Sequence, residues 1–311
     1  MPSFPLSIPN STNVRNRLLA MLMRTEMKLT SALAPEKAVD TAARLFSTPP
    51  RFDHTERERE LLSTGMRYGV ATAHGEIAAW RFGRSDRPAV VLVHGWGGRG
   101  AQLASVVPPL VANGYSVITF DAPGHGQSPG RRSSLIAFVQ AIHAVSRALG
   151  PVRGVIAHSI GAAAAACALR DGLRTDAAVF LAPPADLTLH ADIMLETLGF
   201  GRRARELMRE RVERRLGVAW STLDVAGFAP QMRTPLLVIH DREDAEVPWQ
   251  EGAIIAQAWP GATLSTTSGL GHRRIVRDRD VVREAVSFVL AELHGRRLAR
   301  PSAPQPVMAS A

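Results

Sequence analysis

The sequence predicts an α/β protein in which helices flank a mostly parallel central sheet, and three observations lead to this fold class. Continuous aliphatic runs such as Ala89 to Val93 are typical of strands that are buried on both faces. Helix-length segments separate these runs, and strands that alternate with helices pair in parallel through right-handed crossovers. The composition, with 46% hydrophobic and 21% charged residues, is that of a globular protein.

The expected elements follow one another from about residue 66 to residue 294. Strands are expected at 77–82, 89–93, 116–120, 154–157, 177–181, 236–239 and 263–267, the first of them antiparallel. Helices are expected at 101–113, 132–149, 160–171 and 249–258, and a last helix ends near residue 294. A long, charged and mainly helical insertion interrupts this order at 184–230.

The first 60 residues predict a helical extension. Asn13 is placed to cap a helix that runs to about Ser31, and Pro35 starts a second helix that ends before Pro49. The apolar stripe of the first helix consists of Leu18, Leu19, Met21, Leu22 and Met23. We expect this stripe to pack on the main body rather than to mediate dimerisation or rest on lipid, because acidic residues such as Glu26 weaken attraction to anionic lipid.

The chain thus divides into five expected parts. The helical extension at 1–60 precedes the first part of the core at 61–183, and the helical insertion at 184–230 separates it from the second part at 231–299. A tail at 300–311 with three prolines is expected to be disordered.

The net charge of +9 comes almost entirely from arginine, since the chain has only two lysines. The densest arginine run, at 202–215, alternates with glutamates and has no aromatic residue, so it predicts a solvated helix face and no nucleic-acid partner. Cys167 is the only cysteine, which excludes an intramolecular disulfide and a cysteine-built metal cluster. No apolar run is long enough for a signal peptide or a membrane span, so we expect a cytoplasmic protein, with a membrane surface as the less favoured partner.

The segment from Val155 to Ala162 carries the main catalytic signal. A strand ends at Ala157, Ser159 stands one residue before the next helix, and small residues at 157 and 161 leave room for a sharp strand-to-helix turn. The start of the helix offers a free backbone N–H from Ile160 beside the serine hydroxyl. The alternative interpretation is a serine that only caps a helix.

A second segment, His94-Gly95-Trp96-Gly97-Gly98, follows the buried strand at 89–93. Its glycines let the backbone bend and present the Trp96 N–H as a second donor to a developing oxyanion. A phosphate-binding loop is excluded because no Gly-Lys-Ser/Thr follows, while an ordinary glycine turn remains possible. In the third segment, from Asp121 to Ser128, Asp121 and His125 are expected to shape a turn rather than to catalyse.

A hydrolytic serine also needs a base and a group that orients the base. Asp244 follows the strand at 236–239, and His272 lies in a glycine-flanked loop before the last helix, so the three side chains occur in the order Ser, Asp, His. Asp241 and Glu243 remain alternatives to Asp244. No pair of histidines at helical spacing joins a carboxylate, so no metal site and no cofactor is expected.

These segments together resemble the α/β-hydrolase fold superfamily over about residues 66–295. The resemblance implies that Ser159 is the nucleophile, His272 the general base and then acid, Asp244 the orienter of the imidazole, and the N–H groups of Trp96 and Ile160 the oxyanion hole. His94, Gly95 and His158 are expected to support this site. The chain has Ala157 where the superfamily commonly has glycine, and this small residue meets the same steric demand.

The resemblance makes 184–230 a lid over the pocket and implies acyl transfer to water. A small or medium carboxylic ester is the expected substrate, and thioester, amide or carbon–carbon cleavage are alternatives. A lipase that acts at a membrane surface and a silent hydrolase-fold binding protein also remain open. The sequence makes no prediction of the oligomeric state.

Overall fold

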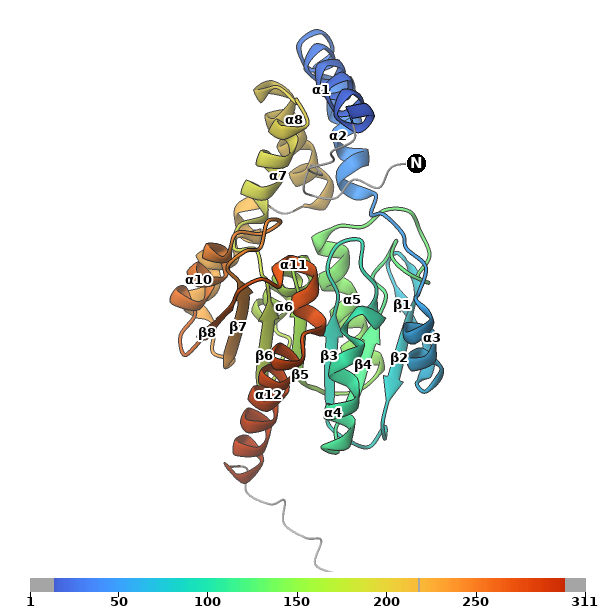
Figure 1. The fold of residues 1–311 in the computed structure, drawn as a ribbon, viewed down its shortest axis with the longest axis vertical. Helices are drawn as coiled ribbons and strands as arrows, with labels where there is room; N and C mark the ends of the chain where they lie inside the picture. The colour runs from blue at the N-terminus through green and yellow to red at the C-terminus, as the bar shows by residue number, and fades with distance from the viewer. Residues whose placement is uncertain (1–13, 218, 300–311) are drawn as a thin grey trace, which may run out of the picture.

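The computed structural model describes residues 14–217 and 219–299, in which an eight-stranded sheet forms the centre (Figure 1). The strand order is β1-β2-β4-β3-β5-β6-β7-β8. Strand β2 is antiparallel to both of its neighbours, β1 and β4, and the six strands β3 to β8 are parallel to one another. Their bounds are β1 Met66–Thr72, β2 Gly75–Phe82, β3 Ala89–Val93, β4 Ser116–Phe120, β5 Val152–His158, β6 Ala177–Leu181, β7 Leu236–Asp241 and β8 Thr263–Thr267. The predicted fold class is confirmed.

Helices cover both faces of the sheet. One hydrophobic cluster joins the sheet to α5 (Leu135–Ala148), α6 (Ile160–Arg170), α9 (Val225–Phe228) and α10 (Trp249–Ala258). A second cluster on the opposite face includes α3 (Glu56–Ser63), the 3₁₀ turn at Gly100–Val106, α4 (Val107–Ala112) and α12 (Arg279–Ala299). Most residues of strands β3 to β7 are buried and apolar, because both faces of the sheet pack against helices.

A third layer lies above the carboxyl ends of the strands (Figure 1) and consists of α1 (Val14–Leu33), α2 (Pro35–Ser47), α7 (Leu187–Thr197) and α8 (Arg202–Leu216). Its cluster is separate from the two sheet clusters and joins Val39 of α2 to Leu195, Phe200 and Met208 of the insertion. Arg211 of α8 adds ion pairs to two acidic residues of α2. The extension and the insertion are therefore packed on each other.

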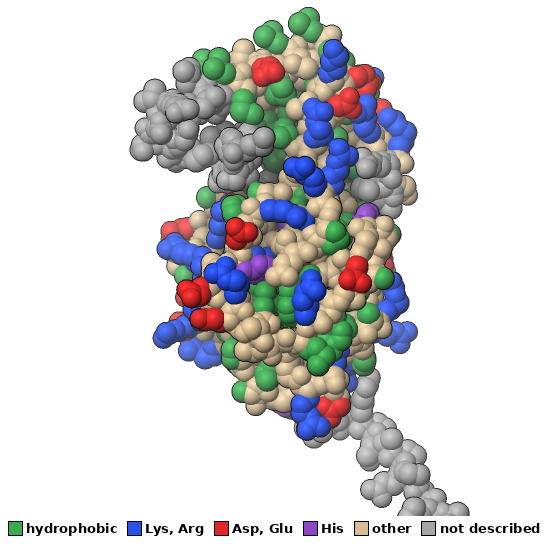
Figure 2. All heavy atoms as spheres, turned by 90° about the vertical axis from the view of Figure 1, so that its right-hand side faces the viewer, with side chains coloured by type: hydrophobic (Ala, Val, Ile, Leu, Met, Phe, Trp, Pro, Cys, Tyr) green, Lys and Arg blue, Asp and Glu red, His purple; other side chains and the backbone are tan. Residues whose placement is uncertain are grey.

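The prediction that the apolar stripe of the first helix packs on the main body is wrong for the part of the stripe that the structure describes. Met21 and Leu22 are 68% and 58% exposed, and Met23 is also exposed. The packed face of α1 instead contains Met27 and Ser31, since the loop between α7 and α8 lies against that side of the helix. Figure 2 shows hydrophobic side chains at this end of the molecule. The proposed cap Asn13 and the side chains of Leu18 and Leu19 lie outside the described residues, as does the tail at 300–311.

Three further elements differ from the expected ones. The helix expected at 101–113 is a 3₁₀ turn followed by α4, because Pro108 and Pro109 have no N–H to continue the first turn. Strand β1 was not expected as an element; it is an edge strand in which only Val70 is buried. Helix α3 was also missed, although Thr55 and Glu58 form a capping box at its start.

The arginine-rich run forms α8, and acidic side chains pair with several of its arginines, among them Glu206 with Arg202 and Asp192 with Arg205. Cys167 is buried in α6, and burial raises the pKa of its thiol to about 11. No helix in the described part of the chain is both long and apolar enough to cross a membrane.

Candidate active site

Ser159 occupies the sharp turn between β5 and α6. Its backbone has φ 55° and ψ −129°, a combination that is strained for any residue except glycine. The Ser159 N–H donates to the carbonyl of Leu181 at 2.9 Å, which ties the turn to β6. A Cβ atom at Gly161 would lie 2.3 Å from the carbonyl oxygen of His94, so only glycine lets the turn approach the neighbouring loop. The strain is therefore held by close packing on both sides.

His272 lies in α11 (Gly271–Arg274), beyond the end of β8, and its imidazole reaches the serine. Its Nδ1 donates to Asp244 Oδ2 at 2.7 Å, since a carboxylate can only accept. Its Nε2 is therefore the acceptor for the Ser159 hydroxyl, at 2.9 Å. Each of the three side chains is less than one tenth exposed. The structure thus brings together three residues that lie up to 113 positions apart in the chain.

Asp244 follows β7 in a tight turn that fixes its carboxylate. Its Oδ1 accepts the backbone N–H groups of Glu246 and Val247, both at 2.8 Å. Burial disfavours the charged carboxylate, but hydrogen bonds from His240, His272 and the Val247 amide outweigh burial and lower the pKa of Asp244. The group stays ionised across the neutral range and holds the imidazole in one tautomer.

His240, which the sequence leaves as either a core residue or a supporting residue of the site, is a further neighbour of Asp244. Its side chain is fully buried at the end of β7; its Nε2 donates to the Val247 carbonyl at 3.0 Å and lies 3.3 Å from Asp244 Oδ2. Asp244 Oδ2 therefore faces two imidazoles. A histidine that ends a strand four residues before the acid was the available signal, but only the turn brings the two together.

The two alternatives to Asp244 hold the histidine loop in place instead. Asp241 Oδ2 accepts from the Thr267 hydroxyl at 2.7 Å and from the Leu270 N–H at 2.9 Å. Glu243 accepts from the Ser268 hydroxyl at 2.6 Å. Neither carboxylate is hydrogen-bonded to His272 in the described structure; both fix the segment that leads to it.

The glycine-rich loop after β3 lies against the serine turn. A Cβ atom at Gly95 would lie 3.1 Å from the Ser159 Cβ atom, so the loop backbone passes directly beside Ser159. Gly97 has a φ of +67° and follows Trp96 in a turn closed by a 3.0 Å hydrogen bond from the Gly98 N–H to the Gly95 carbonyl. Trp96 follows Gly95 in this loop, and Ile160 follows Ser159 as the first residue of α6.

Buried neutral histidines support the loop and the turn. His94 Nε2 accepts the Ala122 N–H at 3.0 Å, so its Nδ1 carries the proton and donates to the Gly95 carbonyl at 2.7 Å. His158 Nε2 donates to the backbone carbonyl of His272 at 2.9 Å. Burial, together with the neighbouring His272, lowers the pKa of His158 to about 3. Both residues contact the backbone of site loops, as expected for supporting groups.

The loop after β4 completes the surroundings. Asp121 accepts the N–H groups of Gly100 and Gln127, both at 2.7 Å, and burial raises its pKa. The ring of His125 packs against the rings of Trp96 and His94, with centroids 5.3 Å and 5.0 Å apart. Both side chains shape the loop, in agreement with the sequence analysis.

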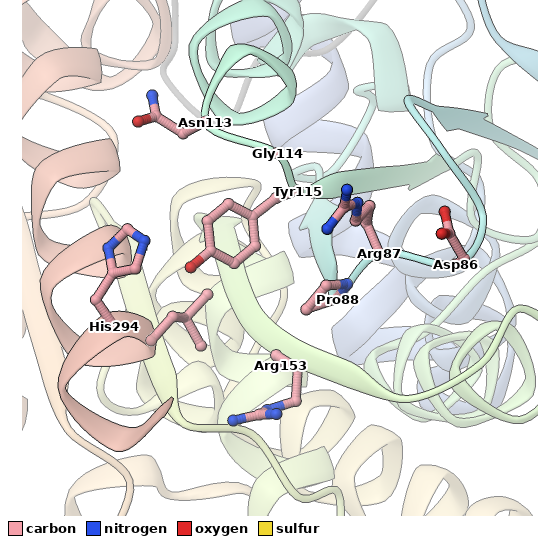
Figure 3. A pocket seen from close by; sticks show the side chains of 9 residues that line it. Asp86, Arg87, Pro88, Asn113, Gly114, Tyr115, Arg153 and His294 are labelled. Carbon is pink, nitrogen blue, oxygen red and sulfur yellow. The ribbon is translucent and has the colours of Figure 1, made fainter. Parts of the chain in front are cut away.

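A hollow of about 460 Å³ lies at the other end of the sheet (Figure 3). Its lining includes Pro88, Tyr115 and Arg153, which lie at the starts of β3, β4 and β5, and His294 of α12. Ser159 follows the end of β5, so this hollow is separate from the serine site. Within residues 14–217 and 219–299, no group of three or more His, Cys, Asp or Glu side chains is arranged to hold a metal ion.

Comparisons with known proteins agree with this architecture. The family model described as the alpha/beta hydrolase fold matches residues 88–206. The chain is similar to the esterase Pf2001 of Pyrococcus furiosus, with a TM-score of 0.60 and 19% identity over 80% of this chain and 98% of that one. It is also similar to a bromoperoxidase of Bacillus anthracis, with a TM-score of 0.55 and 20% identity over 73% of this chain and all of that one.

One sequence relative is the pimeloyl-[acyl-carrier protein] methyl ester esterase of Aromatoleum aromaticum, 42% identical over 57 residues, or 18% of this chain and 22% of that protein. The chain spans less than a quarter of the length of the relatives that it matches in sequence. The chain is a protein of the α/β-hydrolase fold.

Proposed function

We propose that this protein is a serine hydrolase that cleaves a carboxylic ester through an acyl-enzyme intermediate. The observation that carries the proposal is the continuous hydrogen-bonded series from Ser159 Oγ through both nitrogens of His272 to Asp244 Oδ2. This series follows the geometry that a weak nucleophile needs in order to lose its proton during attack. The similarity to esterases supports the choice of an ester.

In the proposed reaction, His272 Nε2 takes the hydroxyl proton while Ser159 Oγ attacks the ester carbonyl carbon. The resulting oxyanion accepts hydrogen bonds from the N–H groups of Trp96 and Ile160, and one such donor typically contributes about 3–4 kcal/mol to the barrier reduction. The imidazolium then gives its proton to the leaving alcohol, and the acyl-enzyme remains. A water molecule activated by His272 attacks the acyl carbon and releases the acid and the free serine.

The substrate class that we propose is a small or medium acyl ester, with the insertion at 184–230 as a lid. Leu195 and Phe200 are buried in the cluster with α2 and attach the insertion to the extension. Leu189 and Ile193 of α7 are about half exposed and do not belong to this cluster. We therefore propose that these two side chains face the acyl group when the substrate binds.

Covalent labelling with a fluorophosphonate probe tests the proposed nucleophile. We expect the parent protein to be labelled, the Ser159→Ala variant to remain unlabelled, and the His272→Ala variant to react far more slowly. Ser287→Ala, which changes an exposed serine of α12, is the matched control and keeps the parent rate. Label that persists on Ser159→Ala, or a parent protein that is never labelled, refutes the proposal.

A further inference from the structure

The segment at 47–58, between α2 and the first turn of α3, lies against two loops of the serine site. We call these residues the N-terminal clasp. At its start, the Ser133 N–H donates to the Ser47 carbonyl at 2.7 Å. The match to the family model begins only at residue 88, so the clasp lies outside the matched region.

Arg51 is the main contact of the clasp with the loop after β4. Its Nε donates to the Gly124 carbonyl at 2.9 Å, and its Nη2 donates to the carbonyls of Ser128 and Gly130 at 2.5 Å and 2.8 Å. Gly124 and Gly130 both have positive φ values, and the backbone of this loop is irregular. One charged side chain thus donates hydrogen bonds to three carbonyl groups of an irregular loop.

The clasp also contacts the loop that carries Trp96. A Cβ atom at Gly97 would lie 2.8 Å from the Pro50 ring, which shows how closely the two segments pass. Glu58 Oε2 accepts from both Nε and Nη2 of Arg99, at 2.8 Å and 2.6 Å. These two side chains are 12% and 9% exposed, so the ion pair is largely shielded from water. The clasp therefore touches residues one and three positions after Trp96.

The two sets of contacts meet at the Trp96 ring. The loop that Arg51 holds carries His125, whose ring packs at 80° against the ring of Trp96. The same loop begins at Asp121, which accepts the N–H of Gly100. Displacement of either loop would move the Trp96 backbone, because the packed rings and this hydrogen bond join them.

We infer that the N-terminal clasp positions the Trp96 amide for the oxyanion, with Arg51 and Glu58 as positioning residues. The inference rests on the proposed function for its catalytic consequence. An oxyanion donor must lie about 2.7–3.1 Å from the position of the developing charge, so a small shift of the loop weakens stabilisation of the transition state. Substrate binding in the ground state depends much less on this donor.

The test uses the full-length protein and the Arg51→Ala variant, with Arg174→Ala, an exposed arginine of the loop between α6 and β6, as the matched control. Activity toward a 4-nitrophenyl ester is expressed per active site, counted by fluorophosphonate titration. We expect kcat of Arg51→Ala to fall about 10- to 100-fold with KM within about threefold of the parent value, because the complete loss of one donor costs about 10²–10³-fold. The affinity for a trifluoromethyl ketone, which forms a tetrahedral oxyanion adduct, should fall by the same factor, and Arg51→Lys should be intermediate.

Hydrogen exchange gives a readout that does not need activity. We expect Arg51→Ala to speed amide exchange at 94–100 and 121–130 but not in the central strands. Unchanged exchange in these two loops overturns the inference, whatever the activity. An unchanged kcat per active site, or a loss that Arg174→Ala shares, also overturns it. A parent protein without labelling at Ser159 refutes the proposed function instead, and exchange still decides whether the clasp holds the loop.

Discussion

At the scale of single residues, the site depends on side chains whose surroundings leave them one arrangement. Ser159 is held in a strained turn, and His272 has one tautomer because a carboxylate accepts from its Nδ1. Asp244 keeps its charge because three N–H groups donate to its two oxygens and the His240 imidazole lies 3.3 Å away. Such preorganisation lets electrostatic stabilisation act without rearrangement during the reaction.

Exchange of Asp244 for asparagine tests the orienting role. An asparagine side chain can donate to Nδ1, which favours the wrong tautomer of His272, so we expect kcat of Asp244→Asn to fall roughly 10⁴-fold. Glu243→Gln is the matched control, and we expect it to stay within about threefold of the parent because the glutamine amide oxygen can still accept the hydrogen bond from the Ser268 hydroxyl. The measurement is ester hydrolysis per titrated active site. Equal losses in the two variants would contradict the assignment.

The steric role of Gly161 can be tested in the same way. We expect Gly161→Ala to destabilise the protein by several kcal/mol and to abolish labelling of Ser159, because its methyl group would collide with the backbone of His94. Gly295→Ala in α12 meets open space and should be neutral or stabilise the protein by up to about 1 kcal/mol. Urea unfolding of both variants is the measurement. A stable, fully labelled Gly161→Ala protein would contradict this view of the turn.

At the scale of elements, the helices above the sheet form a packing unit of their own. Helices α2, α7 and α8 share one hydrophobic cluster that contains no strand residue. The sheet clusters are larger and hold every strand of the parallel sheet from β3 to β7. Elements with a small separate core open at lower free energy than the central sheet.

Truncation of Met208 tests this separation. Met208 is 2% exposed in the cluster shared by α2, α7 and α8. Exchange of a buried methionine for alanine typically lowers the free energy of unfolding by about 2–5 kcal/mol. We expect Met208→Ala to speed hydrogen exchange in α2 and α8 while β3 and β5 keep the protection of the parent. Mass spectrometry of peptic peptides measures both regions. Equal acceleration in the strands would show that the two layers unfold together.

At the scale of the whole molecule, buried uncharged histidines link the site to acid stability. Burial is the main cause that lowers the pKa values of His94, His125 and His158 below 6.5, to about 4 for His125 and about 3 for His158. Below pH 6.5 the unfolded chain binds protons at these positions and the folded chain does not. The free energy of unfolding therefore falls as the pH falls.

Urea unfolding between pH 7 and pH 5 tests this dependence. Each of the three histidines contributes a decrease that approaches about 1.4 kcal/mol per pH unit. Burial raises the pKa of Asp121, which makes the free energy of unfolding rise as the pH falls. The test therefore compares the pH slope of the free energy of unfolding between the parent and His125→Asn. We expect a shallower slope for His125→Asn across this range, because the pKa of folded His125 is lowered to about 4. Parallel slopes for the two proteins would contradict the assignment.

The α/β class, the place of each central strand and the candidate serine and histidine of the site could be predicted from the sequence. These follow from local rules, because buried strands such as β3 need aliphatic residues and a sharp turn around Ser159 needs small neighbours. Edge strand β1 and helix α3 have weaker local patterns, since only one side chain in each is buried.

The long-range arrangement of the chain determines which acid reaches His272, that His240 faces the same carboxylate, and that Arg51 holds a loop of the site more than 70 residues away in the chain. It also determines that α2 packs on the insertion and that Met21, Leu22 and Met23 of α1 are exposed. The physical reason is that hydrogen bonds and packing between distant segments depend on how the chain is brought together. Local periodicity and residue type constrain each segment but not its partner.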